Sequence, residues 1–163
     1  MSVNKYQPHV MVLPEDRANH ELAHGFSINV TATQRIFQVL PEAGGWPEVR
    51  KLFQEVHRLE MERNAFRHMV LLVDFDQEAN RLSEMKKVIP DSLSDRVFVI
   101  GVWSEPEELK RKKLGSRESI GRQLASECNE NQSDLWNHEL LIHNANELDR
   151  MKVKLRPILF PSA

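Results

Sequence analysis

The chain has very little cysteine and no long apolar run. Its only cysteine, Cys128, cannot form a disulfide within the chain. A reducing compartment is therefore expected, and we predict the cytoplasm. No Cys/His cluster has the spacing of a structural zinc site. No apolar run approaches the roughly 18–20 residues that cross a bilayer, and the N-terminal segment lacks an apolar signal core. We therefore expect no membrane partner.

An excess of positive charge is also absent. The 163 residues include 22 Lys and Arg against 24 Asp and Glu, a formal net charge of −2. A strongly basic, non-specific nucleic-acid binder is thereby disfavoured, although a local basic patch fits these numbers. With 40% hydrophobic and 28% charged residues, the composition is that of a globular protein. Its length fits one domain that buries a sizeable core.

Short apolar runs alternate with helical patterns over the first two thirds of the chain. Strands are predicted at four places, residues 10–13, 35–41, 68–73 and 96–102. Between them, apolar residues recur at the helical period, with Asp16 as the N-cap of the first helix. Alternation of this kind indicates βαβ units. We expect a three-layer α/β fold, with a mainly parallel central sheet of about four to five strands and helices on both faces.

The last third of the chain is predicted to be a helical extension of the same domain. The core spans about residues 10–109, and the extension spans residues 110–163. Its helices include one over residues 133–155, capped by Ser133 or Asp134. Residues 155–161 form a short apolar tail that could be an edge strand. No repeat or linker divides the chain, so a single domain over 1–163 is expected.

Acidic residues follow three of the predicted strands. They are Glu15 and Asp16 after the first strand, Asp74 and Asp76 after the third, and Glu105, Glu107 and Glu108 after the fourth. In a parallel sheet, functional groups gather beyond the carboxyl ends of the strands. The sequence therefore predicts that these acids share one edge of the sheet.

The pair Asp74 and Asp76 carries the most chemical information. Strand side chains alternate between faces, so two carboxylates two residues apart can converge. Carboxylates that close repel each other unless a cation holds them, and Mg²⁺, or Mn²⁺ in its place, is the natural ion for oxygen ligands. The alternative is that these acids only cap the following helices. Asp16 suits that capping role best, which leaves Glu15 free.

Residues 42–49, EAGGWPEV, separate the second predicted strand from a helix. Gly44 and Gly45 do not have the spacing of either glycine-rich phosphate motif, so turn geometry is the first interpretation. The alternative is that the following helix N-terminus meets a phosphate. Arg17 and Lys112 are the basic candidates to face that phosphate.

The order of these motifs resembles the Toprim domain of topoisomerases, bacterial primases, recombination proteins of the RecR type and nucleases of the overcoming-lysogenization-defect family. The similarity covers about residues 10–109. It is greatest to that last branch and to small stand-alone Toprim-like proteins, in which a segment like VFVIGVWSEPEEL follows the D-x-D pair. A Toprim/Rossmann-like fold is what the resemblance implies.

The resemblance also implies roles for particular residues. Glu15, Asp74 and Asp76 match the family's metal-binding and catalytic acids. Glu107 or Glu108 is similar to a further glutamate of the overcoming-lysogenization-defect branch.

Gly45 matches the family's glycine after the second strand. The sequence departs from the family at Asp16, where many Toprim domains have glycine, and at Pro14, which precedes the glutamate. The only tyrosine, Tyr6, lies before the first strand, so a topoisomerase-type nucleophile is missing.

A Mg²⁺-dependent nuclease acting on nucleic acid, with DNA favoured over RNA, is the function that the resemblance implies. A second ion would be held by Glu107 or Glu108 with Asp16. Two alternatives remain open. The chain is either a non-catalytic binding module for a separately encoded ATPase, or a nucleotide-processing enzyme. A homodimer is also left open.

Overall fold

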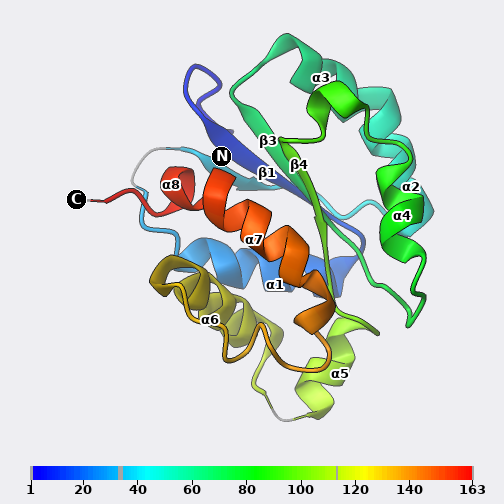
Figure 1. Ribbon diagram of the computed structural model, residues 1–163, viewed down its shortest axis with the longest axis vertical. Helices are drawn as coiled ribbons and strands as arrows, with labels where there is room; N and C mark the ends of the chain where they lie inside the picture. Colours follow the sequence, from blue (N-terminus) through cyan, green and yellow to red (C-terminus); the bar gives the residue numbers. More distant parts are fainter. Residues whose placement is uncertain (1, 33–34, 113, 163) are drawn as a thin grey trace.

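The computed structural model describes residues 2–32, 35–112 and 114–162, and it confirms the three-layer α/β fold (Figure 1). Four parallel strands form the central sheet in the order β2-β1-β3-β4. They are β1 (His9–Pro14), β2 (Phe37–Val39), β3 (Arg67–Leu72) and β4 (Val97–Ile100). The central strands β1 and β3 pair over their whole length, so they end side by side.

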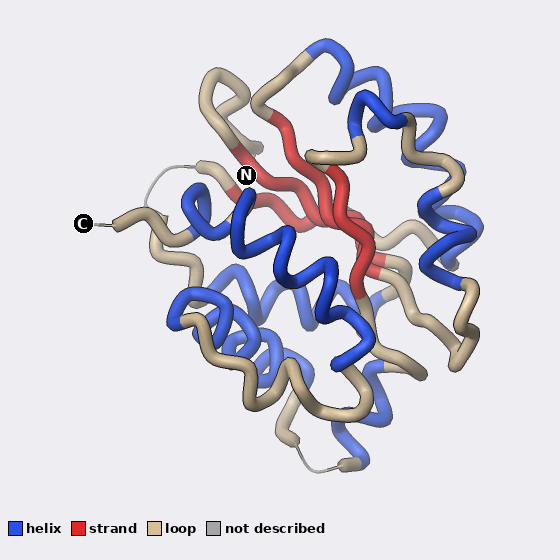
Figure 2. Tube along the Cα trace, in the orientation of Figure 1, coloured by secondary structure: helices blue, strands red, loops and turns tan. Residues whose placement is uncertain are grey.

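Helices cover both faces of the sheet (Figures 1 and 2). One face is covered by α2 (Trp46–Leu52), η1 (Phe53–His57), α3 (Arg58–Arg63) and α4 (Arg81–Lys86). The other face is covered by α1 (Arg17–Ile28), α6 (Arg117–Glu130), α7 (Ala145–Lys154) and α8 (Arg156–Leu159). The remaining elements are the single turns η2 (Asp91–Leu93) and η3 (Ile142–Asn144) and the short helix α5 (Pro106–Arg111). No helix in the described ranges is long and apolar enough to cross a membrane.

Alternate strand residues supply two separate cores. On β1, Met11 and Leu13 pack with the side chains of α2, η1, α3 and α4, whereas Val10 and Val12 pack with those of α1, α6, α7 and α8. All four side chains are buried. Because both faces of the sheet are covered, its central strands are continuous apolar runs, which is the pattern that made them recognisable in the sequence.

The predicted helix over residues 133–155 is wrong in its first half. α7 begins only at Ala145, and neither Ser133 nor Asp134 caps it. The carboxylate of Glu127, in α6, instead accepts hydrogen bonds from the N–H groups of Leu135 and Trp136, at 2.8 and 3.2 Å. These bonds satisfy backbone donors without a helix, so the apolar residues of this segment pack as a loop.

The predicted edge strand over residues 155–161 is also wrong, because this segment contains helix α8. Pro157 occupies the first turn of α8, where its missing N–H costs nothing. The core on the sheet face that α1, α6 and α7 cover includes Leu155, Leu159 and Phe160.

The C-terminal segment covers the free edge of β4 with side chains instead of a fifth strand. The Asn144 amide donates to the Gly101 carbonyl at 2.9 Å and accepts from the Gly101 N–H at 3.1 Å. The Glu147 carboxylate accepts from the Val99 N–H at 2.9 Å. The outward Val99 N–H and both backbone groups of Gly101, the residue after β4, are thereby satisfied, which helps to protect this edge of the sheet from pairing with another chain.

Helices α1 and α6 approach closely at two glycines. A Cβ atom added at Gly25 would lie 2.0 Å from the Glu118 carbonyl oxygen, and one added at Gly121 would lie 2.1 Å from that of Leu22. Both distances are far below van der Waals contact. Any side chain at either position must therefore push the two helices apart.

We expect Gly121→Ala to lower the free energy of unfolding by about 1–3 kcal/mol, because it overpacks this helix contact. Urea denaturation of the purified protein measures the effect. Arg122→Ala, at an exposed position of the same helix, is the matched control and should change stability by less than about 0.5 kcal/mol. Equal stability of Gly121→Ala and the parent chain would contradict the close helix contact.

Candidate functional site

The ends of β1 and β3 bring Glu15 and Asp74 into contact. The Glu15 N–H continues the strand pairing by donating to the Leu72 carbonyl at 2.8 Å. Two residues beyond the end of β3, the Asp74 N–H donates to Glu15 Oε2 at 2.5 Å. Glu15 is 8% exposed and Asp74 is 7% exposed. The predicted sharing of one sheet edge is therefore realised for these two acids, which are almost fully buried.

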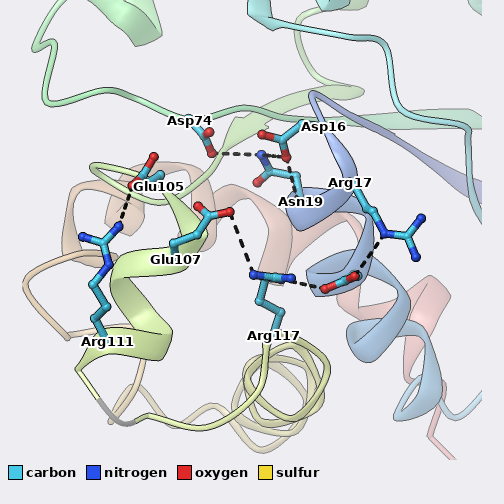
Figure 3. A network of polar contacts seen from close by, with 9 residues as sticks. Asp16, Arg17, Asn19, Asp74, Glu105, Glu107, Arg111 and Arg117 are labelled. Atoms are coloured by element: carbon cyan, nitrogen blue, oxygen red, sulfur yellow. Dashed lines mark hydrogen bonds and ion pairs between the residues drawn. The ribbon is translucent and has the colours of Figure 1, made fainter.

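Asn19 joins the acids that follow the two strands. Asp16 caps α1, as predicted, by accepting the Asn19 N–H at 2.9 Å. The Asn19 Nδ2 donates to Asp16 Oδ1 at 3.0 Å and to Asp74 Oδ1 at 2.9 Å (Figure 3). The side chain is fully buried, yet its Oδ1 takes no hydrogen bond. An unsatisfied oxygen thus lies on an amide held between two carboxylates.

Burial dominates the electrostatics of this pair. It raises the pKa of Asp74 from 3.8 to about 8, and the nearby carboxylates of Glu15, Asp16 and Asp76 add to the rise. Burial likewise raises the pKa of Glu15, although N–H groups of Asp74 and Trp46 partly stabilise its charge. Among the described residues, neither Glu15 nor Asp74 forms an ion pair. The two carboxylates therefore need a proton or a cation to offset their burial.

Asp76 has a different partner. Its φ of 51° and the φ of 59° at Gln77 lie in the left-handed region. Since β3 ends at Leu72, the alternation on which convergence with Asp74 was predicted does not extend to Asp76. The Asp76 carboxylate is exposed and accepts a hydrogen bond from Arg81 Nη1 at 2.8 Å.

Arg81 is held at three points. Its Nη1 also donates to the main-chain carbonyl of Asp74 at 2.7 Å, and its guanidinium lies 4.4 Å from the centre of the Trp46 ring. Only 8% of the Arg81 side chain is exposed. This arginine therefore links the end of β3 to the start of α2 through a hydrogen bond and a cation–π contact.

The acids that follow β4 pair with arginines (Figure 3). Glu105 pairs with Arg111 at 2.9 Å, and Glu108 pairs with the same guanidinium. Glu107 lies 3.9 Å from Arg117. Within the described part of the chain, no hydrogen bond or ion pair connects these glutamates to Glu15 or Asp74.

The two glycines of the EAGGWPEV segment hold the main chain of Glu15. The Gly44 and Gly45 N–H groups donate to the Glu15 carbonyl oxygen at 2.8 and 3.1 Å. Their φ angles of 102° and 137° are accessible to glycine and strained for other residues. Both N–H groups are thus used in hydrogen bonds within the protein, and the turn fixes the main chain of Glu15.

The two basic candidates for phosphate binding lie on exposed surfaces in loose ion pairs. Arg17 is 3.5 Å from Glu21, and its side chain is 83% exposed. Lys112 is 3.3 Å from Glu139, and its side chain is 50% exposed. Exposed pairs of this kind contribute little stability, so either cation can exchange onto another anion.

The donor atoms of the site suit a hard cation. No group of three or more His, Cys, Asp or Glu side chains in residues 2–32, 35–112 and 114–162 is arranged as a metal cage. Mg²⁺, however, is usually held by one or two carboxylates with waters and substrate oxygens. Glu15 and Asp74 supply two carboxylates, and Asn19 Oδ1 supplies a neutral oxygen. These residues fit that mode of binding.

Three residues of the site escaped the sequence analysis: Asn19, Arg81 and Trp46. Asn19 had a usable signal, because it lies three residues after the N-cap Asp16 and hence beside it on the first helical turn. Arg81 had no such signal in the sequence, because its contact depends on where the left-handed turn places the Asp76 carboxylate.

Comparison of the chain with protein-family models, with curated proteins and with solved structures gave no match. The chemistry of the site is therefore inferred from its own residues.

We expect Asp74→Asn to stabilise the protein at neutral pH. Between about pH 4 and pH 8 the folded chain keeps a proton on Asp74 that the unfolded chain releases, so stability falls as pH rises through this window. Asparagine carries no charge at any pH and removes this loss. The free energy of unfolding should rise by about 2–4 kcal/mol at pH 7 and change little at pH 4.

Urea denaturation at pH 4 to 8 measures this difference. Asp149→Asn, at an exposed position of α7, is the control and should stay within about 0.5 kcal/mol of the parent chain at each pH. A stability gain in Asp74→Asn that does not depend on pH would contradict the proposed cost of burying this carboxylate.

Proposed function

We propose that the chain is a Toprim-like, Mg²⁺- or Mn²⁺-dependent enzyme that cleaves phosphodiester bonds. The observation that carries the proposal is the contact between Glu15 and Asp74 at the ends of adjacent parallel strands. Two buried carboxylates with raised pKa values and no ion pair among the described residues form an environment that favours a bound cation. Perturbed carboxyl groups at this edge of a parallel sheet are typical of functional sites.

The chain's own residues have distinct tasks in such a reaction. A bound Mg²⁺ supplies charge stabilisation at a phosphoryl oxygen and lowers the pKa of a coordinated water. Glu15 and Asp74 bind the cation, and Asn19 orients Asp74 by donating to its Oδ1. The N–H groups of Gly44 and Gly45 fix the main chain of Glu15.

Arg17 supplies a cation for the substrate. Its pairing with Glu21 is exposed and loose, so its guanidinium can bind a phosphate oxygen with two N–H groups. Lys112, paired with Glu139 on the surface, offers a point charge in the same way.

A nucleotide-processing enzyme is the second candidate, and the charge around the site favours it. Arg111 and Arg117 are both paired with glutamates of α5, and Arg117 also pairs with Glu21 at 2.6 Å. The chain as a whole carries a net charge of −2. A long polyanion is recognised by several unpaired cations, whereas a mononucleotide needs few.

Cleavage assays test the proposal. The purified chain with Mg²⁺ or Mn²⁺ is expected to hydrolyse supercoiled plasmid or an activated phosphodiester such as bis-p-nitrophenyl phosphate. Asp74→Asn and Glu15→Gln should each lower the rate by about 100-fold or more, because each removes a charged ligand that stabilises the transition state. Glu62→Gln, on the exposed surface of α3, is the matched control and should retain full activity.

The substrate panel separates the two candidates. Hydrolysis of plasmid supports the nuclease, and hydrolysis of free nucleotides with intact plasmid supports the nucleotide-processing enzyme. Equal rates in the parent chain and Asp74→Asn on every substrate would overturn both.

A further inference from the structure

We infer that the site takes a single divalent cation, because Arg81 fills the role of a second positive charge beside Asp74 and Asp76. The inference rests on the proposed function and departs from the two-ion arrangement expected from the sequence. It makes Arg81 a positioning residue, and it excludes Asp76 from the ligands of the cation.

The contacts of Arg81 make its charge a permanent part of the site. One nitrogen, Nη1, bonds both the Asp76 carboxylate and the Asp74 carbonyl, at 2.8 and 2.7 Å. The guanidinium stacks on Trp46, and the side chain is 8% exposed. A guanidinium does not deprotonate in proteins. If Asp76 turned to a metal ion, Arg81 would be left buried without its carboxylate, which is strongly unfavourable.

The backbone also holds Asp76 away from the buried pair. The Asp76 N–H donates to the Ser104 carbonyl at 3.3 Å, and the Gln77 N–H donates to the Trp103 carbonyl at 2.8 Å. These bonds tie the left-handed turn to the chain that follows β4. A rotation that brought Asp76 toward Glu15 would break them together with the Arg81 contact.

The other acids that the sequence placed at this edge are engaged as well. Asp16 is committed to the cap of α1 and to Asn19. Arg111 pairs with Glu105 and Glu108, and Glu107 lies 3.9 Å from Arg117, in a looser pair on the exposed side of α5. A two-ion site needs ions about 3.5–4 Å apart, each with its own carboxylates.

Of the acids that the sequence placed at this edge, Glu15 and Asp74 are left as charged donors for a cation, and in the described residues neither carboxylate accepts a hydrogen bond from Arg81. The candidate donor set consists of Glu15, Asp74 and the buried Asn19, whose Nδ2 lies between Asp16 and Asp74 and whose Oδ1, on the same amide, takes no hydrogen bond (Figure 3). The unpartnered oxygen is an observation independent of the carboxylates: it is a buried acceptor, on an amide bonded to Asp74, that a cation would satisfy. One divalent cation beside Glu15 and one guanidinium beside Asp76 thus balance the three carboxylates of Glu15, Asp74 and Asp76.

Isothermal titration of the full chain with Mn²⁺ tests the inference without any enzymatic assay. We expect a stoichiometry of one ion per chain. Asp74→Asn should weaken Mn²⁺ binding by about tenfold or more, since it removes one of two charged ligands. Asp76→Asn should change the affinity by less than about threefold. A stoichiometry of two, or equal losses in the two variants, would overturn the inference.

Substitutions of Arg81 provide the complementary test. Arg81→Gln releases Asp76 and is expected to allow a second ion to bind, whereas Arg81→Lys keeps the positive charge and the stoichiometry of one. Circular dichroism and thermal unfolding identify variants that do not fold, and the Asp76→Asn titration decides the question if Arg81→Gln is among them. A folded Arg81→Gln that still binds one ion would contradict the role of Arg81. Absence of Mn²⁺ binding by the parent chain would instead overturn the proposed metal-dependent function.

Discussion

The full-length pairing of β1 with β3 is the interaction on which both the fold and the candidate site depend. The register joins His9 to Arg67 and Pro14 to Leu72, and the Glu15 N–H extends it by one bond. The next donor, the Asp74 N–H, finds a side-chain oxygen of Glu15 in place of a main-chain carbonyl. At the site, a side-chain oxygen thus replaces a main-chain carbonyl as the acceptor in the hydrogen bonds that join the two strands. Because both faces of these strands are buried, a slip by one residue would exchange the two cores, and the register cannot shift.

Burying Glu15 and Asp74 at that point works against the stability of the fold. The apolar strands exclude water from the carboxylates, which is why their pKa values rise. Natural proteins accept such destabilisation mainly where a site requires it. The surrounding chain supplies only partial compensation, through the Asn19 amide and the N–H groups of Asp74 and Trp46. The arrangement is costly without a ligand and becomes favourable when a cation or a proton is present.

The strands were predictable from the sequence because two-sided burial leaves continuous apolar runs, and Asp16 was predictable as a cap because capping is local. The loop before α7 was not, since Glu127 draws it into place through bonds across eight and nine residues. The predicted edge strand is absent for a similar reason: side chains of Asn144 and Glu147 already bond the outward backbone groups of Val99 and Gly101 at the edge of the sheet. For the site, residue type and strand position predicted Glu15 and Asp74. The departure of Asp76 depends on a left-handed turn that no spacing rule reveals.

That departure changes how the D-x-D pair should be understood. If side chains alternated regularly along the strand, Asp74 and Asp76 would point the same way and share one function. The left-handed turn at Asp76 and Gln77 ends that alternation, so the two carboxylates have different partners. Asp74 faces a buried neighbour that can share a proton or a cation with it, and the exposed Asp76 carboxylate pairs with the buried Arg81 guanidinium. Arg81 then acts on both acids, since the nitrogen that neutralises Asp76 also holds the main chain of Asp74. The orientation of the buried carboxylate thus depends on an ion pair outside the cation's own ligands. The two aspartates remain coupled, although the coupling runs through a guanidinium and not through a shared metal ion.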